Sequence, residues 1–171
     1  MVKRSICLGI LAVLSAAGAM EITFDKKVSG WVRSDRVNIV LDSTEKVSET
    51  GSLRLTSNPK KKHVNISKTI ELEPDQEYEI TLMVKGENIS DKKTGIFFKS
   101  GKRHWDRLAR WTGTFDWTKC TGTLKTGPAE DGPNKLSITL FGPDAKLWID
   151  QLKIELKGKA ESNAAKEESN Q

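Results

Sequence analysis

The sequence predicts an all-β protein in which two antiparallel sheets pack face to face as a sandwich. Short runs of alternating apolar and polar residues recur along the chain, and this alternation is typical of strands with one buried and one solvated face. Turn-forming residues separate the runs, as in Asn58-Pro59 and Gly142-Pro143-Asp144. Beyond its first residues, the chain shows almost no apolar repeat of helical period. We therefore expect eight or nine strands in two packed sheets.

Each expected strand starts where the alternation starts and ends at a turn signal. The clearest is "EYEITLMVKG", which places Tyr78, Ile80, Leu82 and Val84 on one face. In "RVNIVLD" the same rule places Val37, Ile39 and Leu41 on the buried face. The other expected strands lie at 52–57, 63–72, 95–100, within 102–117, and at 115–125, 135–142 and 145–156.

The first 19 residues have the features of an export signal. Lys3 and Arg4 precede an apolar run over 6–17, and Ala17-Gly18-Ala19 fits a cleavage site before Met20. The run is short for a transmembrane helix, although an uncleaved anchor is the alternative. We expect a secreted, periplasmic or envelope protein with no membrane span after cleavage.

The rest of the chain divides into one sandwich domain, 20–157, and a polar tail, 158–171. The tail has no aromatic and no branched aliphatic residue, which predicts disorder. The predicted signal contains two basic residues, so the remainder has 26 basic against 23 acidic residues and a net charge of +3. This mild excess does not call for a nucleic-acid partner.

Cys120 is the only cysteine after the predicted signal, so no internal disulfide is possible there. We expect a buried thiol, since free cysteine usually behaves as a small hydrophobic residue. The alternative, a reactive thiol, would need a lowered pKa and a histidine partner.

Several motifs in order resemble a known family. These are "FDKKVSGW", "SETGSLRLTS", "IELEPDQEYEITLMVKG", "GTFDWTKCTGTL" and "LWIDQLKIEL". Their order and spacing are similar to those of the CenC-type carbohydrate-binding modules of families four, nine and twenty-two, over about residues 21–156. The resemblance implies a galactose-binding-like jelly roll that binds a polysaccharide without cutting it. It also implies a structural calcium ion, with Asp25 and Asp150 as carboxylate ligands. The alternative is that Asp150 caps a strand end or pairs with a lysine.

Five tryptophans are candidates for core packing or for stacking on sugar rings. We expect Trp31, Trp117 and Trp148 to be structural, because large aromatic side chains dominate cores. Trp105 and Trp111 differ, because a continuous strand would place both on one face with Arg103 and Arg107. A buried guanidinium needs a partner, so this face suits a ligand surface better than a core.

The predicted ligand residues are Trp105, Trp111, Arg103, Arg107 and Arg110. Their basic surroundings, with Lys99 and Lys102, favour an acidic polysaccharide. Alternatively, one of the two tryptophans belongs to the core, with a bulge or turn between them, or the segment is a loop. A second basic run, "PKKKH" at 59–63, falls in a turn and is expected to be solvated.

No catalytic constellation is evident in the sequence. No expected strand pairs two carboxylates beside an aromatic groove, as glycoside hydrolysis normally requires. We therefore favour a non-catalytic glycan-binding protein of unassigned oligomeric state. Two alternatives are an envelope or adhesion module without a glycan ligand, and a small polysaccharide lyase that uses His104 with Tyr78.

Overall fold

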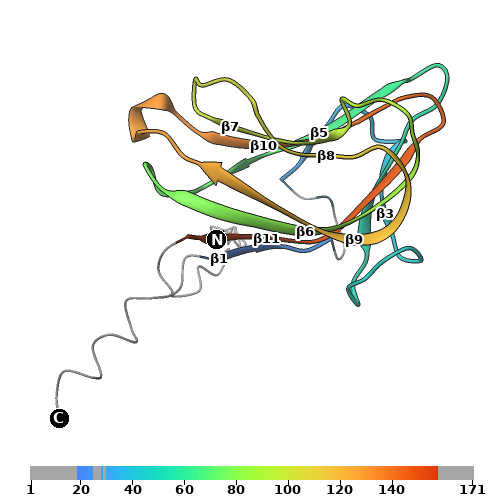
Figure 1. The fold of residues 1–171 in the computed structure, drawn as a ribbon, viewed down its shortest axis with the longest axis horizontal. Helices are drawn as coiled ribbons and strands as arrows, with labels where there is room; N and C mark the ends of the chain where they lie inside the picture. Colours follow the sequence, from blue (N-terminus) through green and yellow to red (C-terminus); the bar gives the residue numbers. More distant parts are fainter. Residues whose placement is uncertain (1–18, 25–27, 29, 158–171) are drawn as a thin grey trace, which may run out of the picture.

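The computed structural model of the protein describes residues 19–24, 28 and 30–157, which form two antiparallel sheets. The six-stranded sheet has the order β3-β4-β11-β6-β9, and β1 pairs with the second half of β11. The five-stranded sheet has the order β2-β5-β10-β7-β8. Figure 1 shows the two sheets as layers, with β5, β7, β8 and β10 above β1, β6, β9 and β11. The bounds are β1 (Ala19–Ile22), β2 (Val32–Arg33), β3 (Ile39–Asp42), β4 (Ser52–Thr56), β5 (His63–Ile70), β6 (Glu77–Ile89), β7 (Gly95–Ser100), β8 (Asp106–Arg110), β9 (Gly113–Lys125), β10 (Asn134–Phe141) and β11 (Lys146–Leu156), with a 3-10 turn η1 (Ala129–Asp131).

The all-β sandwich with a jelly-roll architecture is confirmed, and most strands lie where the alternation places them. One expectation fails at the start of β3. Val37 is 84% exposed rather than buried. The Asp35 carboxylate accepts the backbone N–H groups of Val37 and Asn38 at 2.8 and 3.2 Å, so a turn occupies these positions and the strand begins only at Ile39. The short strands β1 and β2 were not predicted.

The core lies between the sheets and contains the inward residues of both. Tyr78, Ile80, Leu82 and Val84 are all buried, as the period of two predicts. The Tyr78 hydroxyl accepts the backbone N–H of Glu73 at 2.9 Å, which satisfies its polar end inside the core.

The remaining structural predictions have mixed outcomes. Trp31 and Trp148 are buried, as expected, whereas Trp117 on β9 is only half-buried. Cys120 is half-buried against the core, and burial raises the pKa of its thiol, which opposes a reactive thiolate.

Parts of the sequence prediction lie outside the described residues. These are the signal segment apart from Ala19, the tail 158–171, and Asp25. Within the described ranges, the structure contains no helix that is both long and apolar enough to span a membrane.

Candidate ligand-binding groove

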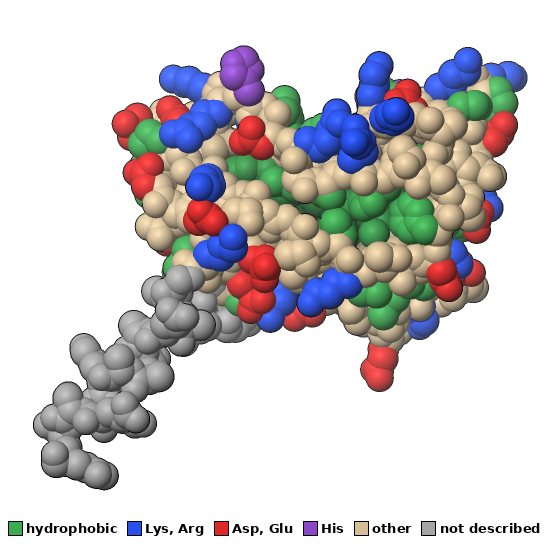
Figure 2. Space-filling view, viewed as in Figure 1, with side chains coloured by type: hydrophobic (Ala, Val, Ile, Leu, Met, Phe, Trp, Pro, Cys, Tyr) green, Lys and Arg blue, Asp and Glu red, His purple; other side chains and the backbone are tan. Residues whose placement is uncertain are grey.

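A groove of about 470 Å³ lies on the outer face of the five-stranded sheet. Its floor follows β10 from Lys135 to Phe141, a length of about 20 Å at ~3.3 Å per residue. Strand β5 borders it on one side, and β7 and β8 border it on the other. In Figure 2 the upper edge of the molecule is hollowed between two raised ends, and Lys and Arg side chains stand along it. The lining residues are His63, Asn65, Ser67, Lys93, Phe97, Trp105, Arg107, Lys135, Ser137, Thr139 and Phe141.

Small polar side chains from β5 and β10 form the middle of the floor. The amide nitrogen of Asn65 donates to the Ser137 hydroxyl at 2.6 Å and to the Thr139 hydroxyl at 2.9 Å. This cross-strand network is possible because Asn65 lies directly opposite Thr139 in the ladder. The floor therefore presents fixed hydroxyl groups that can exchange hydrogen bonds with a polar ligand.

Aromatic rings stand along the groove from one end to the other. Trp105 lies near the Lys135 end and is 45% exposed. Phe97 lies in the middle, and the Arg107 guanidinium sits 5.3 Å from the centroid of its ring. At the far end, His63 stacks on Phe141 with their centroids 4.4 Å apart and their planes 15° from parallel. Of the apolar rings that line the groove, Trp105 is the exposed one, and its indole offers a face on which a sugar ring can stack.

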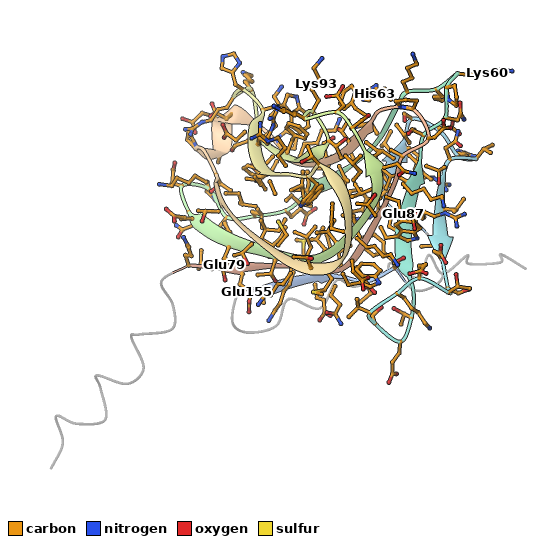
Figure 3. All side chains as sticks on the ribbon, turned by 45° about the vertical axis from the view of Figure 1, so that its right-hand side comes forward. Lys60, His63, Glu79, Glu87, Lys93 and Glu155 are labelled. Atoms are coloured by element: carbon orange, nitrogen blue, oxygen red, sulfur yellow. The ribbon has the colours of Figure 1, made fainter. Side chains whose placement is uncertain are left out.

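The lysine and arginine side chains give the groove a positive charge. Lys135, Arg107 and Lys93 line it, and no aspartate or glutamate does. None of the three cations forms an ion pair with a carboxylate of the described residues, whereas Lys61 pairs with Asp35 at 2.8 Å. Cations without partners beside exposed rings can bind anionic groups bidentately or by point charge. Figure 3 shows Lys93 and His63 on one side of the molecule and Glu79 and Glu155 at the opposite side.

The expectation that Trp105 and Trp111 share one exposed face is wrong. Trp111 is only 8% exposed and belongs to the core. A β-bulge in the pairing of β7 and β8 lies between these tryptophans, so that Leu108 and Ala109 both pack against the core. The extra residue reverses the alternation, and Trp111 points inward while Trp105 stays at the groove. The structure therefore has the alternative arrangement considered from the sequence, in which a bulge leaves one of the two tryptophans in the core.

Gly95 lies beside this bulge, where it pairs with Arg110. A Cβ atom at Gly95 would collide with the backbone carbonyl of Ala109, so only glycine permits β7 to approach β8 this closely.

The other predicted arginines lie outside the groove lining. The Arg103 Nε atom donates to Asp131 at 3.1 Å, which ties the loop before Trp105 to η1. Arg110 is exposed on β8, opposite Gly95, and does not line the groove. Of the five predicted ligand residues, the structure thus brings only Trp105 and Arg107 together in one cavity.

Most groove residues were missed by sequence reasoning. His63, Asn65, Lys93, Phe97 and Phe141 were not singled out as ligand residues, and neither were the outward residues of β10. A signal was present, because Phe97 and Phe141 occupy outward positions where the alternation predicts polar side chains. An aromatic residue on a solvated face is a mark of recognition surfaces.

The lyase alternative requires Tyr78 beside His104. Tyr78 is 3% exposed inside the core, while His104 is exposed and does not line the groove, so this version of the alternative is wrong. The groove lining also contains no pair of carboxylates for glycoside hydrolysis.

The predicted calcium ligand Asp150 has other partners in this structure. Its Oδ2 atom accepts the N–H groups of Val47 and Ser48, both at 2.8 Å, and its Oδ1 accepts the N–H of Gln151 at 2.8 Å. These three backbone N–H donors suit a carboxylate that anchors the loop between β3 and β4. A calcium ion would instead require several oxygen ligands. No group of three His, Cys, Asp or Glu side chains suited to a metal is present in the described part of the chain. Because Asp25 lies outside that part, calcium binding stays a prediction.

A sandwich with an open groove on the outer face of one sheet, lined by rings and polar groups, defines a class of ligand-binding modules. Comparison of the sequence with family models places the chain within this class. Residues 16–146 match the model of the carbohydrate binding domain family, and the chain belongs to that family. The resemblance drawn from its motifs is therefore confirmed. The chain matches no curated protein in sequence.

Solved structures with the same fold include several carbohydrate-binding modules. The CBM22-1 xylan-binding domain of Paenibacillus barcinonensis Xyn10C aligns with a TM-score of 0.65 and 17% identity, covering 84% of this chain and 97% of that one. The C-terminal family 22 module of Clostridium thermocellum Xyn10B aligns with a TM-score of 0.62 and 13% identity, covering 84% and 98%. TmCBM61, solved with β-1,4-galactotriose, aligns with a TM-score of 0.52 and 14% identity, covering 75% and 90%.

Proposed function

We propose that the protein is an exported, non-catalytic module that binds an acidic polysaccharide in the groove of the five-stranded sheet. The observation that carries this proposal is the positive groove, in which Lys93, Arg107 and Lys135 lack carboxylate partners in the described chain and no acidic side chain lines the cavity. A uronate carboxylate or a sulfate ester on the ligand would supply the missing partners.

In the proposed binding mode, aromatic and polar side chains contact the sugar rings, and basic side chains bind the acidic groups. Trp105 stacks on the apolar face of one sugar ring, and the Asn65 network and its hydroxyls hydrogen-bond the sugar hydroxyl groups. Arg107, held over Phe97, directs its guanidinium toward a carboxylate or sulfate. Export rests on the first 19 residues, and N-terminal sequencing of the mature protein should find Met20 first.

The test is isothermal titration calorimetry of the purified protein with polygalacturonate, a sulfated galactan and neutral xylan, each at two salt concentrations. We expect saturable binding of an acidic polymer that weakens as salt rises, because exposed charges are screened. Arg107→Gln should weaken it about tenfold or more, as expected for loss of a charged hydrogen bond. Arg110→Gln is the matched control, since it removes the same charge from the same strand outside the groove, and it should change affinity less than twofold.

Three results would contradict parts of this proposal. Equal losses in the two arginine variants would remove the groove as the site of charge recognition. If the protein prefers xylan and its affinity does not depend on salt, the ligand is a neutral polysaccharide and not an acidic one. Absence of binding to every polymer by the folded protein would favour the envelope-module alternative.

A further inference from the structure

A second cavity, of about 580 Å³, adjoins the Phe141 end of the groove. The two cavities share His63 and Phe141, so the stacked pair of rings forms the boundary between them. Beyond the rings, the second cavity is lined by Lys62, Ser90, Asp91, Lys92, Gly142 and Pro143.

Hydrogen bonds that use none of its lysine side chains join the segments around this second cavity. The Gly142 N–H donates to the Lys62 carbonyl at 2.9 Å, which joins the ends of β5 and β10. The Thr94 hydroxyl accepts the Phe141 N–H at 2.9 Å, which ties the loop before β7 to the end of β10. Gly142 has a φ of 114°, and a Cβ atom there would lie 2.9 Å from the Ser90 hydroxyl oxygen. Glycine therefore suits this backbone conformation and lets Ser90 approach closely.

The lysines of the second cavity are available to a ligand. Lys62 and Lys92 are exposed, and neither forms an ion pair with a carboxylate in the described residues. Asp91 is the one acidic residue in the lining, and one of its carboxylate oxygens accepts the Lys93 N–H at 2.8 Å. This contact closes the turn that carries Lys92 and Lys93.

Five cations without ion-pair partners in the described chain therefore line two adjoining cavities. Lys135 marks one end, Arg107 the middle, Lys93 the boundary, and Lys92 and Lys62 the far side of the ring pair. A groove of about 20 Å followed by a second cavity matches a polymer that carries a charge on successive units better than a ligand with one charge.

We propose that the second cavity is an additional anion subsite, in which Lys62 and Lys92 bind a carboxylate or sulfate of the polysaccharide chain that occupies the groove. The chain crosses the His63–Phe141 pair, and its longer segments contact both cavities. This inference rests on the proposed function of the groove and extends it to the length and charge spacing of the ligand.

The test compares short and long ligands with two double variants of equal charge change. The probes are a trisaccharide and a decasaccharide of galacturonate, and the same two sizes of a sulfated galactan. Lys62→Gln/Lys92→Gln removes the subsite. Lys60→Gln/Lys119→Gln is the control, because both lysines are exposed and line neither cavity. In Figure 3, Lys60 projects outward at the edge of the molecule.

We expect the wild-type protein to bind an acidic decasaccharide more tightly than the trisaccharide. The Lys62/Lys92 variant should lose about threefold to tenfold for the long ligand, as expected for two exposed charge contacts, and less than twofold for the short one. The control should lose less than twofold for both. Unfolding midpoints should be equal in all three proteins.

The outcomes separate this inference from the proposed function. If the wild type binds acidic ligands but the Lys62/Lys92 variant loses equally for both lengths, or no more than the control, the second subsite is refuted and the groove stands. If the wild type binds no acidic ligand of either length, the proposed function fails and the subsite fails with it.

Discussion

Replacement of Asp150 by asparagine should destabilise the protein strongly although the two side chains have nearly the same shape. Asp150 is 1% exposed on β11 and holds the loop between β3 and β4 through the N–H groups of Val47 and Ser48. Its second oxygen accepts the Gln151 N–H. All its protein partners are hydrogen-bond donors, and they approach both oxygens of the carboxylate.

The magnitude follows from the number of donors. An asparagine amide has one oxygen, so either orientation points an NH₂ group at one or two backbone N–H groups. One unsatisfied buried N–H costs about 1–3 kcal/mol, and the remaining bonds lose the strengthening that a charge provides. We expect a loss of about 2–4 kcal/mol, which lowers the melting temperature of a domain of this size by roughly 5–12 °C.

The assay is thermal and urea unfolding of the wild type, Asp150→Asn and Asp116→Asn. Asp116 is the control because its side chain is 87% exposed. A melting temperature for Asp150→Asn within 2 °C of the control would refute the reasoning. The same experiment with calcium or a chelator tests the calcium prediction. Stabilisation of the wild type by calcium, absent from the variant, would show that Asp150 also binds the ion.

Two further predictions concern the core tryptophan and the second buried aspartate. Trp111→Ala should lower the free energy of unfolding by about 3–5 kcal/mol because it empties a core position. Trp105→Ala should lower it by less than about 1 kcal/mol. Equal urea midpoints for the two variants would contradict this. Burial opposes ionisation of Asp42, but hydrogen bonds from Thr44, Trp148 and Glu45 outweigh it and hold the pKa of the carboxyl well below its usual range. Its stabilising effect is therefore present above about pH 4 and is lost as pH falls toward the folded-state pKa. Asp42→Asn should be less stable at pH 7 and should show a shallower loss of stability on acidification; parallel pH profiles would contradict this.

The alternation of side chains determined the sandwich and most of its core. Residues two apart in a strand point to the same face, so Tyr78, Ile80, Leu82 and Val84 could be assigned to one buried face without knowledge of their partners. Turn residues then set where each strand stops. The alternation and the turn residues are local properties, because each depends only on residues that are neighbours in the sequence.

The side of the sheet on which Trp111 lies depends on a contact between strands. The bulge in β8 reverses the alternation, and beside it Gly95 closely approaches the Ala109 carbonyl. The sequence alone allowed either a continuous face or a bulge, because the two differ in pairing with β7 and not in the residues of β8.

The groove is the property that the sequence by itself determined least. It combines outward side chains of β5, β10, β7 and β8 with Lys93 and Trp105 from the adjoining loops. Outward positions carry no hydrophobic pattern that reveals their neighbours, and strand order follows from the packing of the whole domain. The sequence therefore determined the fold, the family and two of the groove residues, Trp105 and Arg107. Only the pairing of β10 with β5 and β7 decided that a row of rings, hydroxyls and cations lies in a single groove.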